Sequence, residues 1–548
     1  MSAIYTAGTG IAVAAFAALG ILLAITIPYH DYDSFAFGDW SRAIAEHGKI
    51  DPLWPGPLAS SRPIFYELQG ALWSVTGISF TAGRLLSLAF ALLLLVGVYA
   101  LARSLRLPRL VCAFAVVVVV CIPAFNQNAL SGETDVPAAA LVALAAAAAI
   151  RPAATRRGLV VGGSLAAAAV LMKQTSLIPL VPLAALLLAE ARTLSPRALI
   201  RRPVGSLVSG LVVGLAYDVV MALRYHLGLL EYLRTGSGGI WAQLADETRK
   251  DALLRGDLLG LALRLPLEFA LVYVVLRASR VRHRPAGVGA LVVALLWSIA
   301  GPFAAGVGHG PFSTADAAFT FVGFALVLAV SLVPPSAVAS TARPFAILGV
   351  LAFPPLIVWA AASTYADRLA APAWPALAVL IAVVLNAGVE ALSRAGAAIS
   401  LAPVVVVAVA AWMGLATYDG FHGELWRGYR ALGWSGLGDR MRTTNIVLPA
   451  IQETLAVVEP RLAGGTLVSQ DPRFAFFLPG VVDTRTPLHC EDLRGARVFV
   501  LLTADESERA AQEVGGLATP EEWSRCTSPK VSQLSDGSNG YAVFAVGS

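Results

Sequence analysis

Runs of about twenty apolar residues recur along most of this 548-residue chain. An α-helix of that length spans the hydrocarbon core of a bilayer, about 30 Å thick at a rise of about 1.5 Å per residue. The composition agrees, since 57% of the residues are hydrophobic and only 14% are charged. Soluble domains normally carry about a quarter charged residues. The sequence therefore predicts a polytopic α-helical membrane protein.

The apolar runs predict about 13 membrane-spanning helices. They cover residues 8–28, 82–102, 110–123, 136–150, 158–172, 175–190, 204–223, 258–276, 287–305, 315–333, 344–362, 370–388 and 399–417.

Basic and acidic residues fall in alternate loops between these runs. Arginines gather at 103–109, 151–157, 192–202 and 277–284, whereas the acids gather at 31–67, 133–135 and 231–257. By the positive-inside rule, the N-terminus is cytoplasmic and the tail after the last run is extracytoplasmic. The net charge of +5 is then accounted for by topology, which excludes nucleic acid as a partner. The richness in alanine, glycine and arginine favours a bacterial inner membrane as the location.

Two domains are expected. Residues 1–417 form the transmembrane domain, whose first extracytoplasmic loop, 29–81, carries amphipathic stretches suited to interfacial helices at Phe35–Glu46 and Ile64–Val75. Residues 418–548 form a small soluble α/β domain. Its expected elements are a helix over Thr444–Arg461 and strands over Gly465–Ser469, Arg497–Thr503 and Tyr541–Val546. Cys490 and Cys526 in this domain pair if it faces an oxidising compartment; whether they do is open.

Two groups of ionisable residues at outer helix ends are candidates for chemistry. Asp31 and Asp33 follow the first helix directly and could accept a proton or bind a metal, or else be solvated interfacial acids. Lys173, Arg84 and Arg368 lie where the positive-inside bias disfavours basic residues, so each needs a phosphate or carboxylate partner. The alternative is contact with lipid headgroups, or pairing with an acid such as Asp367 or Glu133.

The order of short motifs resembles the GT-C class of membrane glycosyltransferases over roughly residues 1–390. The closest branch holds protein O-mannosyltransferases, the aminoarabinose transferases of lipid A, and mycobacterial mannosyl- and arabinosyltransferases. The motifs are Asp31-Tyr32-Asp33, Ser61-Arg62-Pro63, Gly83-Arg84-Leu85, Ser131-Gly132-Glu133-Thr134-Asp135, Met172-Lys173-Gln174, Tyr365-Ala366-Asp367-Arg368 and Ala371-Pro372-Ala373-Trp374-Pro375. Two departures are Ser34, where many relatives have a second acid, and Leu369, where the class has a tyrosine.

The resemblance implies an inverting transfer of a sugar from a polyprenyl-phosphate donor to an extracytoplasmic glycan, lipid or protein acceptor. In this scheme Asp33 is the general base, with Asp31 as the reserve candidate. Lys173, Arg84 and Arg368 bind the donor phosphate. The cavity or acceptor residues are Glu133, Asp135 and His309. No cofactor is implied with certainty, and a divalent metal remains an open alternative.

A transporter or lipid flippase without covalent chemistry is the alternative of another class. Such a protein would place ionisable residues at the membrane midplane, where Asp218 is the main candidate in this sequence. The sequence leaves open the donor sugar (mannose or arabinofuranose among others), the acceptor and the oligomeric state. The C-terminal domain is expected to help hold the acceptor.

Overall fold

The computed structural model describes the N-terminal third of the chain, parts of its later helices and much of the C-terminal domain. The described residues are 2–26, 32–49, 63–120, 122–150, 156–191, 208–217, 219–220, 223, 343–344, 346–352, 354–355, 371–380, 382–383, 449–469, 471, 473–478, 481–484, 493, 495–502, 531–534 and 541–546. The predicted spans 258–276, 287–305, 315–333 and 399–417 lie outside them.

Contacts divide the chain into two compact units. The first contains residues 1–22, 52–65 and 84–424, and the second contains 23–51, 66–83 and 425–548. The first-loop helices therefore belong to the same unit as the C-terminal segment. The predicted domain boundary at residue 417 stays a prediction.

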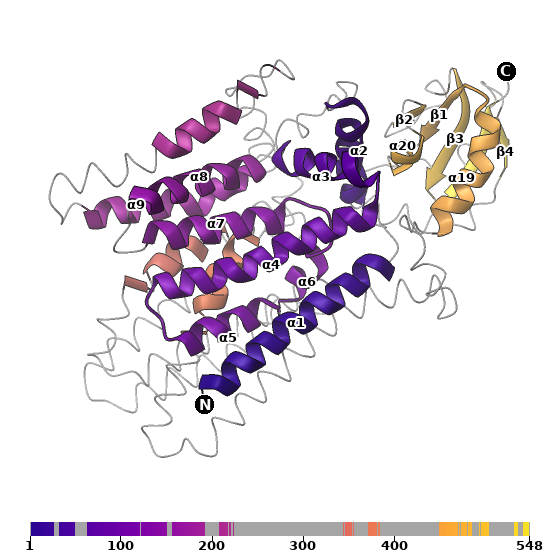
Figure 1. Ribbon diagram of the computed structural model, residues 1–548. Helices are drawn as coiled ribbons and strands as arrows, with labels where there is room; N and C mark the ends of the chain where they lie inside the picture. Colours follow the sequence, from indigo (N-terminus) through magenta and orange to yellow (C-terminus); the bar gives the residue numbers. More distant parts are fainter. Residues whose placement is uncertain are drawn as a thin grey trace, which may run out of the picture. The chain divides into compact units, whose positions relative to one another are not determined.

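Among the described residues of the first unit, the regular elements are all helices, joined by short turns (Figure 1). Its elements, including two helices whose ends extend into the second unit, are α1 Ser2–Thr26, α4 Phe80–Ser104, α5 Arg109–Val120, α6 Pro123–Asn128, α7 Asp135–Ile150, α8 Arg156–Met172, the 3-10 turn η2 Gln174–Ser176 and α9 Leu177–Ala191. Two later helical segments cover Val208–Tyr217 and Ala371–Leu380. By length and composition, one helix of the described part, Phe80–Ser104, could cross a membrane. The number of spans stays a prediction.

Small residues bring three of these helices close together. Helix α7 is rich in alanine and is almost entirely buried, with α8 packed along it. Where α4 meets α7, a Cβ on Gly97 would lie 3.0 Å from Ala143 Cβ and 3.3 Å from the Ala140 carbonyl oxygen. Figure 1 shows α7 running beside both α4 and α8. Close backbone approach through small residues is how helices pack where no water drives them together.

The short helix α6 lies between the first helix and a late one. The Phe125 ring stacks on Phe16 of α1 with centroids 5.2 Å apart, and it meets Trp374 edge-on at 6.3 Å. Segments about 250 residues apart in the sequence are thus joined next to the loop that leads into α7.

The second unit combines two first-loop helices with an α/β domain. Helices α2 Tyr32–His47 and α3 Pro63–Thr76 cover the stretches predicted as interfacial helices. They cross at Gly70, where a Cβ would lie 2.6 Å from Ile44 Cγ2 and 2.9 Å from the Ser41 carbonyl oxygen. Only glycine allows the two helices to approach this closely.

The α/β domain contains a five-stranded mixed sheet in the order β2-β1-β3-β5-β4. Strands β1, β2 and β3 are parallel, whereas β5 runs antiparallel to both β3 and β4. The elements are α19 Pro449–Leu462, β1 Thr466–Ser469, α20 Arg473–Phe477, β2 Val482–Thr484, β3 Ala496–Leu502, β4 Val531–Gln533 and β5 Tyr541–Val546. The predicted helix and its three predicted strands are present as α19, β1, β3 and β5. The sequence did not predict β2 and β4.

Alternation along β3 divides the domain core into two layers. Val498 and Val500 face α19 and its buried residues Ile451 and Val458. Phe499 faces the other side, where its ring stacks on Phe544 with centroids 4.6 Å apart. This is the period of two expected when both faces of a strand are covered.

Candidate active site

A buried ion pair joins two residues that the sequence marked separately. Lys173 Nζ donates a hydrogen bond to Asp135 Oδ1, and the two side chains are only 3% and 2% exposed. Their positions are 38 residues apart in the sequence. Charges this deeply buried are costly unless they are paired, so neither residue can be removed alone without a penalty.

Lys173 is placed by a break between two helices. Helix α8 ends at Met172, and Lys173 adopts an extended backbone conformation before the η2 turn. Its backbone N–H still donates to the Ala169 carbonyl oxygen at 2.9 Å, and Ser176 Oγ donates to that same oxygen at 2.9 Å. The Lys173 side chain therefore extends from a backbone turn that these two hydrogen bonds hold in place.

Asp135 is placed by a tight turn before α7. Gly132 has a φ of +73°, a left-handed conformation that side-chain-bearing residues rarely adopt. The chain then enters α7, where the Ala138 N–H donates to the Thr134 carbonyl oxygen at 3.0 Å. Asp135 lies in the first turn of α7, where a carboxylate is favoured by the helix dipole.

Two buried side-chain oxygens next to this pair in the sequence, and a third in α6, have no hydrogen-bond partner within the described residues. They are Thr134 Oγ1, next to Asp135, Thr175 Oγ1, two residues after Lys173, and Asn126 Oδ1 of α6. The Asn126 amide is oriented by its Nδ2, which donates to the Val120 carbonyl oxygen at 2.8 Å. Leaving a buried polar atom without a hydrogen-bond partner costs about 1–3 kcal/mol. The three atoms therefore indicate a region that receives a polar ligand or water.

The other predicted residues fall into three groups. Arg84 near the start of α4 and Glu133 are both buried in the first unit, at 7% and 3% exposed, and both have interaction partners. Asp33 lies in the first turn of α2, in the second unit. Asp31, His309, Arg368 and Asp218 lie outside the described residues, as do Cys490 and Cys526.

Sequence reasoning placed Lys173 and Asp135 in different roles and did not pair them. It also assigned no role to Asn126, Thr134 or Thr175. The available signal was local, since Thr134 directly precedes α7, Thr175 lies in the turn between α8 and α9, and Asn126 lies in the short helix α6. Among the described residues, no group of three or more His, Cys, Asp or Glu is arranged to hold a metal ion.

One family model matches part of the chain. Residues 61–220 match the family model described as dolichyl-phosphate-mannose-protein mannosyltransferase. The matched segment contains Arg84, Asp135 and Lys173. No curated protein matches the sequence.

Two solved structures are similar in fold. ArnT from Cupriavidus metallidurans bound to undecaprenyl phosphate is matched with a TM-score of 0.54 and 12% identity, over 98% of each chain. The archaeal oligosaccharyltransferase AglB from Archaeoglobus fulgidus, in complex with an inhibitory peptide and a dolichol-phosphate, is matched with a TM-score of 0.52 and 12% identity. That match covers 92% of this chain and 71% of AglB. At this identity the likeness shows the fold alone.

Proposed function

We infer the function of this protein from its resemblance to the GT-C class of membrane glycosyltransferases, which is confirmed by the family match over residues 61–220 and by the fold that it shares with ArnT and AglB. From this premise we propose that the protein is an inverting glycosyltransferase that uses a polyprenyl-phosphate sugar as donor. The acceptor is an extracytoplasmic hydroxyl of a glycan, lipid or protein. Asp33 is the proposed general base, and Asp31 is the reserve candidate.

The proposed reaction is a single displacement at the anomeric carbon. Asp33 takes the proton of the acceptor hydroxyl as its oxygen forms a bond to that carbon from the face opposite the phosphate. The bond between the anomeric carbon and the phosphate oxygen breaks, and its electron pair leaves with the oxygen. The leaving group is then a phosphate monoester dianion, and the configuration at the anomeric carbon is inverted.

The buried pair of Lys173 and Asp135 is the observation that carries the proposal. A dianionic leaving group needs nearby positive charge in a site that excludes water. Because an ammonium group carries three N–H donors, one lysine can contact a carboxylate and a phosphate oxygen together. In this scheme Asp135 orients Lys173, and Arg84 and Arg368 add positive charge to the phosphate site. Glu133 and His309 are assigned to the cavity or the acceptor.

The neighbouring structures support the class of donor. ArnT was solved with undecaprenyl phosphate, and AglB was solved with a dolichol-phosphate. Both lipids are polyprenyl phosphates, which is the carrier proposed for this chain. The proposal also places the N-terminus in the cytoplasm and residues 418–548 outside the cell.

The first test is sugar transfer by purified protein from a panel of polyprenyl-phosphate mannose, arabinofuranose and other sugars. Wild type is compared with Asp33→Asn and Asp31→Asn, since asparagine keeps the size of the side chain but cannot act as a base. Loss of transfer in folded Asp33→Asn alone supports the assignment. If only Asp31→Asn is inactive, the class stands and Asp31 becomes the base.

A transporter or flippase is the second candidate, because a buried ion pair in a membrane protein also marks substrate and proton pathways. It is favoured if wild type consumes no donor in the panel but moves a polyprenyl-phosphate lipid between the leaflets of reconstituted vesicles. Donor consumption with product formation decides for the transferase.

A further inference from the structure

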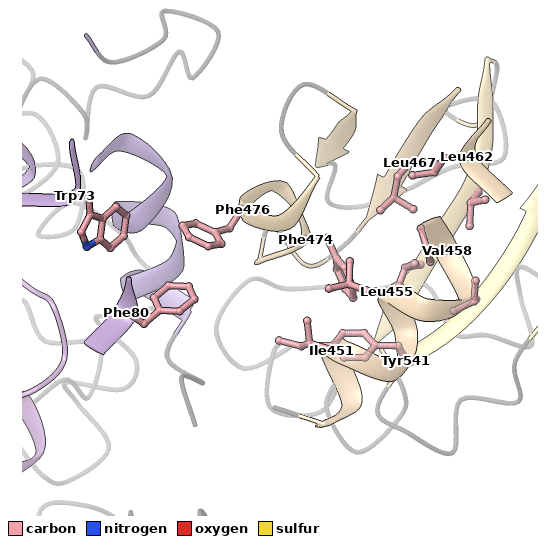
Figure 2. Packing of buried hydrophobic residues seen from close by; sticks show 13 residues of the cluster. Trp73, Phe80, Ile451, Leu455, Val458, Leu462, Leu467, Phe474, Phe476 and Tyr541 are labelled. Atoms are coloured by element: carbon pink, nitrogen blue, oxygen red, sulfur yellow. The ribbon is translucent and has the colours of Figure 1, made fainter. Parts of the chain in front are cut away.

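One aromatic side chain of the C-terminal domain points away from that domain's own core. In α20, Phe474 packs inward and meets Tyr541 edge-on with centroids 5.1 Å apart. Phe476, two residues on, points to the helices of the first loop (Figure 2). Its ring lies 4.8 Å from that of Phe80 and 6.3 Å from that of Trp73, centroid to centroid. Phe476 is 5% exposed.

Helix α2 closes the other side of this contact. An ideal Cβ on Gly38 would lie 3.3 Å from Phe476 Cε2 and 3.5 Å from Trp73 Cη2. A larger side chain at position 38 would therefore compete with the phenylalanine ring for space. The absence of a side chain on Gly38 leaves room for Phe476 beside α2.

Arg42 fixes both the ring and the backbone of Phe476. Its Nη1 donates a hydrogen bond to the Phe476 carbonyl oxygen, and its guanidinium carbon lies 5.7 Å from the centre of the ring. Glu46, one turn further along α2, holds Arg42 Nε at 3.0 Å. A planar guanidinium can stack on a ring and donate to a carbonyl at once, which a lysine ammonium cannot do.

The contact and the proposed base share one helix. Gly38 and Arg42 are one turn apart and form a single contact face on α2. Asp33 is in the first turn of the same helix, and position 33 lies about half a turn around the helix axis from Arg42. The contact thus holds α2 from one side without occupying the side on which position 33 lies.

We propose that Phe476 is a positioning residue: by packing against Gly38, Arg42, Trp73 and Phe80, it fixes α2 and thereby the position of Asp33. This inference rests on the proposed function. It assigns to the C-terminal domain a role in aligning the base, in addition to any contact with the acceptor.

The test compares the same substitution on opposite faces of the domain, in the full-length protein in detergent. Phe476→Leu removes the ring that reaches α2, whereas Phe499→Leu removes a ring of the core layer on the other face of the sheet. We expect the backbone amides of residues 32–47 to exchange hydrogen about tenfold faster in Phe476→Leu and at the wild-type rate in Phe499→Leu. We also expect kcat to fall by about tenfold to a hundredfold in Phe476→Leu with an unchanged Kd for the donor.

A second variant approaches the contact from the helix, in case Phe476→Leu does not fold. Arg42→Lys keeps the charge but loses the stacking and the forked donor geometry, and it leaves the domain core intact. As in Phe476→Leu, the amides of residues 32–47 should exchange hydrogen faster and kcat should fall. Unchanged exchange or unchanged kcat in both variants, in an active wild-type background, would overturn the positioning role alone. If wild type transfers no sugar, the proposed function fails first, and the positioning role fails with it.

Discussion

Lys173 and Asp135 are both buried, and each charge lowers the free-energy cost of burying the other. Lys173→Met leaves the Asp135 carboxylate buried without its ammonium partner, which should destabilise the protein by about 3–5 kcal/mol. The double variant Lys173→Met with Asp135→Leu removes both charges and should recover most of that loss, because apolar replacements of buried pairs are often neutral or stabilising. Thermal unfolding in detergent measures both effects.

Activity separates the two roles of this pair. If Lys173 contacts the donor phosphate, the double variant should be stable yet transfer sugar at least about a hundredfold more slowly than wild type. Recovery of transfer together with stability would show that the pair is structural and that the phosphate is bound elsewhere. The single variants cannot make this distinction, because they lose stability and charge together.

Gly132 sets the approach of the chain to Asp135. Its φ of +73° disfavours any residue with a Cβ, so Gly132→Ala should cost about 1–2 kcal/mol in stability and lower transfer through misplacement of Asp135. The matched control is Gly214→Ala in the helical segment Val208–Tyr217, where an added Cβ would meet nothing within 4 Å. Thermal unfolding of the two variants decides the prediction, and it fails if they behave alike.

The sequence pattern predicted which single residues belong to the site better than it predicted which residues contact each other. Lys173 was marked because a cation at an outer helix end needs a partner, and that reasoning is local. Its expected partner was the donor phosphate or, in the alternative, an acid such as Asp367 or Glu133. The structure pairs it with Asp135, which had been assigned to the cavity or the acceptor. The pairing depends on how α7 and α8 pack along each other, which apolar periodicity does not specify.

Whole elements were easier to predict than contacts. The apolar runs at 82–102, 136–150 and 158–172 correspond to α4, α7 and α8 with boundaries that differ by two residues or fewer. The thickness of the hydrocarbon core sets the length of a membrane-spanning helix, so each such helix appears in the sequence as a long apolar run. By contrast α6, β2 and β4 are only 6, 3 and 3 residues long and carry too few residues to show a period. Their existence follows from tertiary packing.

The crossing of α2 and α3 gives a prediction at the scale of elements. Gly70→Ala would bring a Cβ to 2.6 Å from Ile44 and 2.9 Å from a carbonyl oxygen of the α2 backbone, so the helices must separate. We expect a loss of about 1–3 kcal/mol from overpacking, together with faster amide exchange in both helices. Gly10→Ala in α1 is the control, since nothing lies within 4 Å of its added Cβ. Equal exchange in the two variants would contradict the tight crossing.

At the scale of the whole molecule, the α/β domain has two separable proposed roles. It holds α2 through Phe476, and it is expected to help hold the acceptor. Deleting residues 424–548 removes both, and it also uncovers Trp73 and Phe80, which are 1% and 3% exposed in the intact protein. Deletion alone therefore cannot assign acceptor binding to the domain. The full-length Phe476→Leu variant is the control that loses only the first role.

The expected difference lies in the kinetic parameter that each change affects. Loss of alignment lowers kcat, since the base is misplaced once the complex has formed, whereas loss of an acceptor contact raises the acceptor KM. We expect the deletion to raise the acceptor KM by about tenfold or more beyond the value in Phe476→Leu, with the donor Kd unchanged in both. Membrane insertion of the deleted chain is checked first. Equal losses for donor and acceptor, with normal insertion, would mean that the domain supports the fold of the enzyme and does not hold the acceptor.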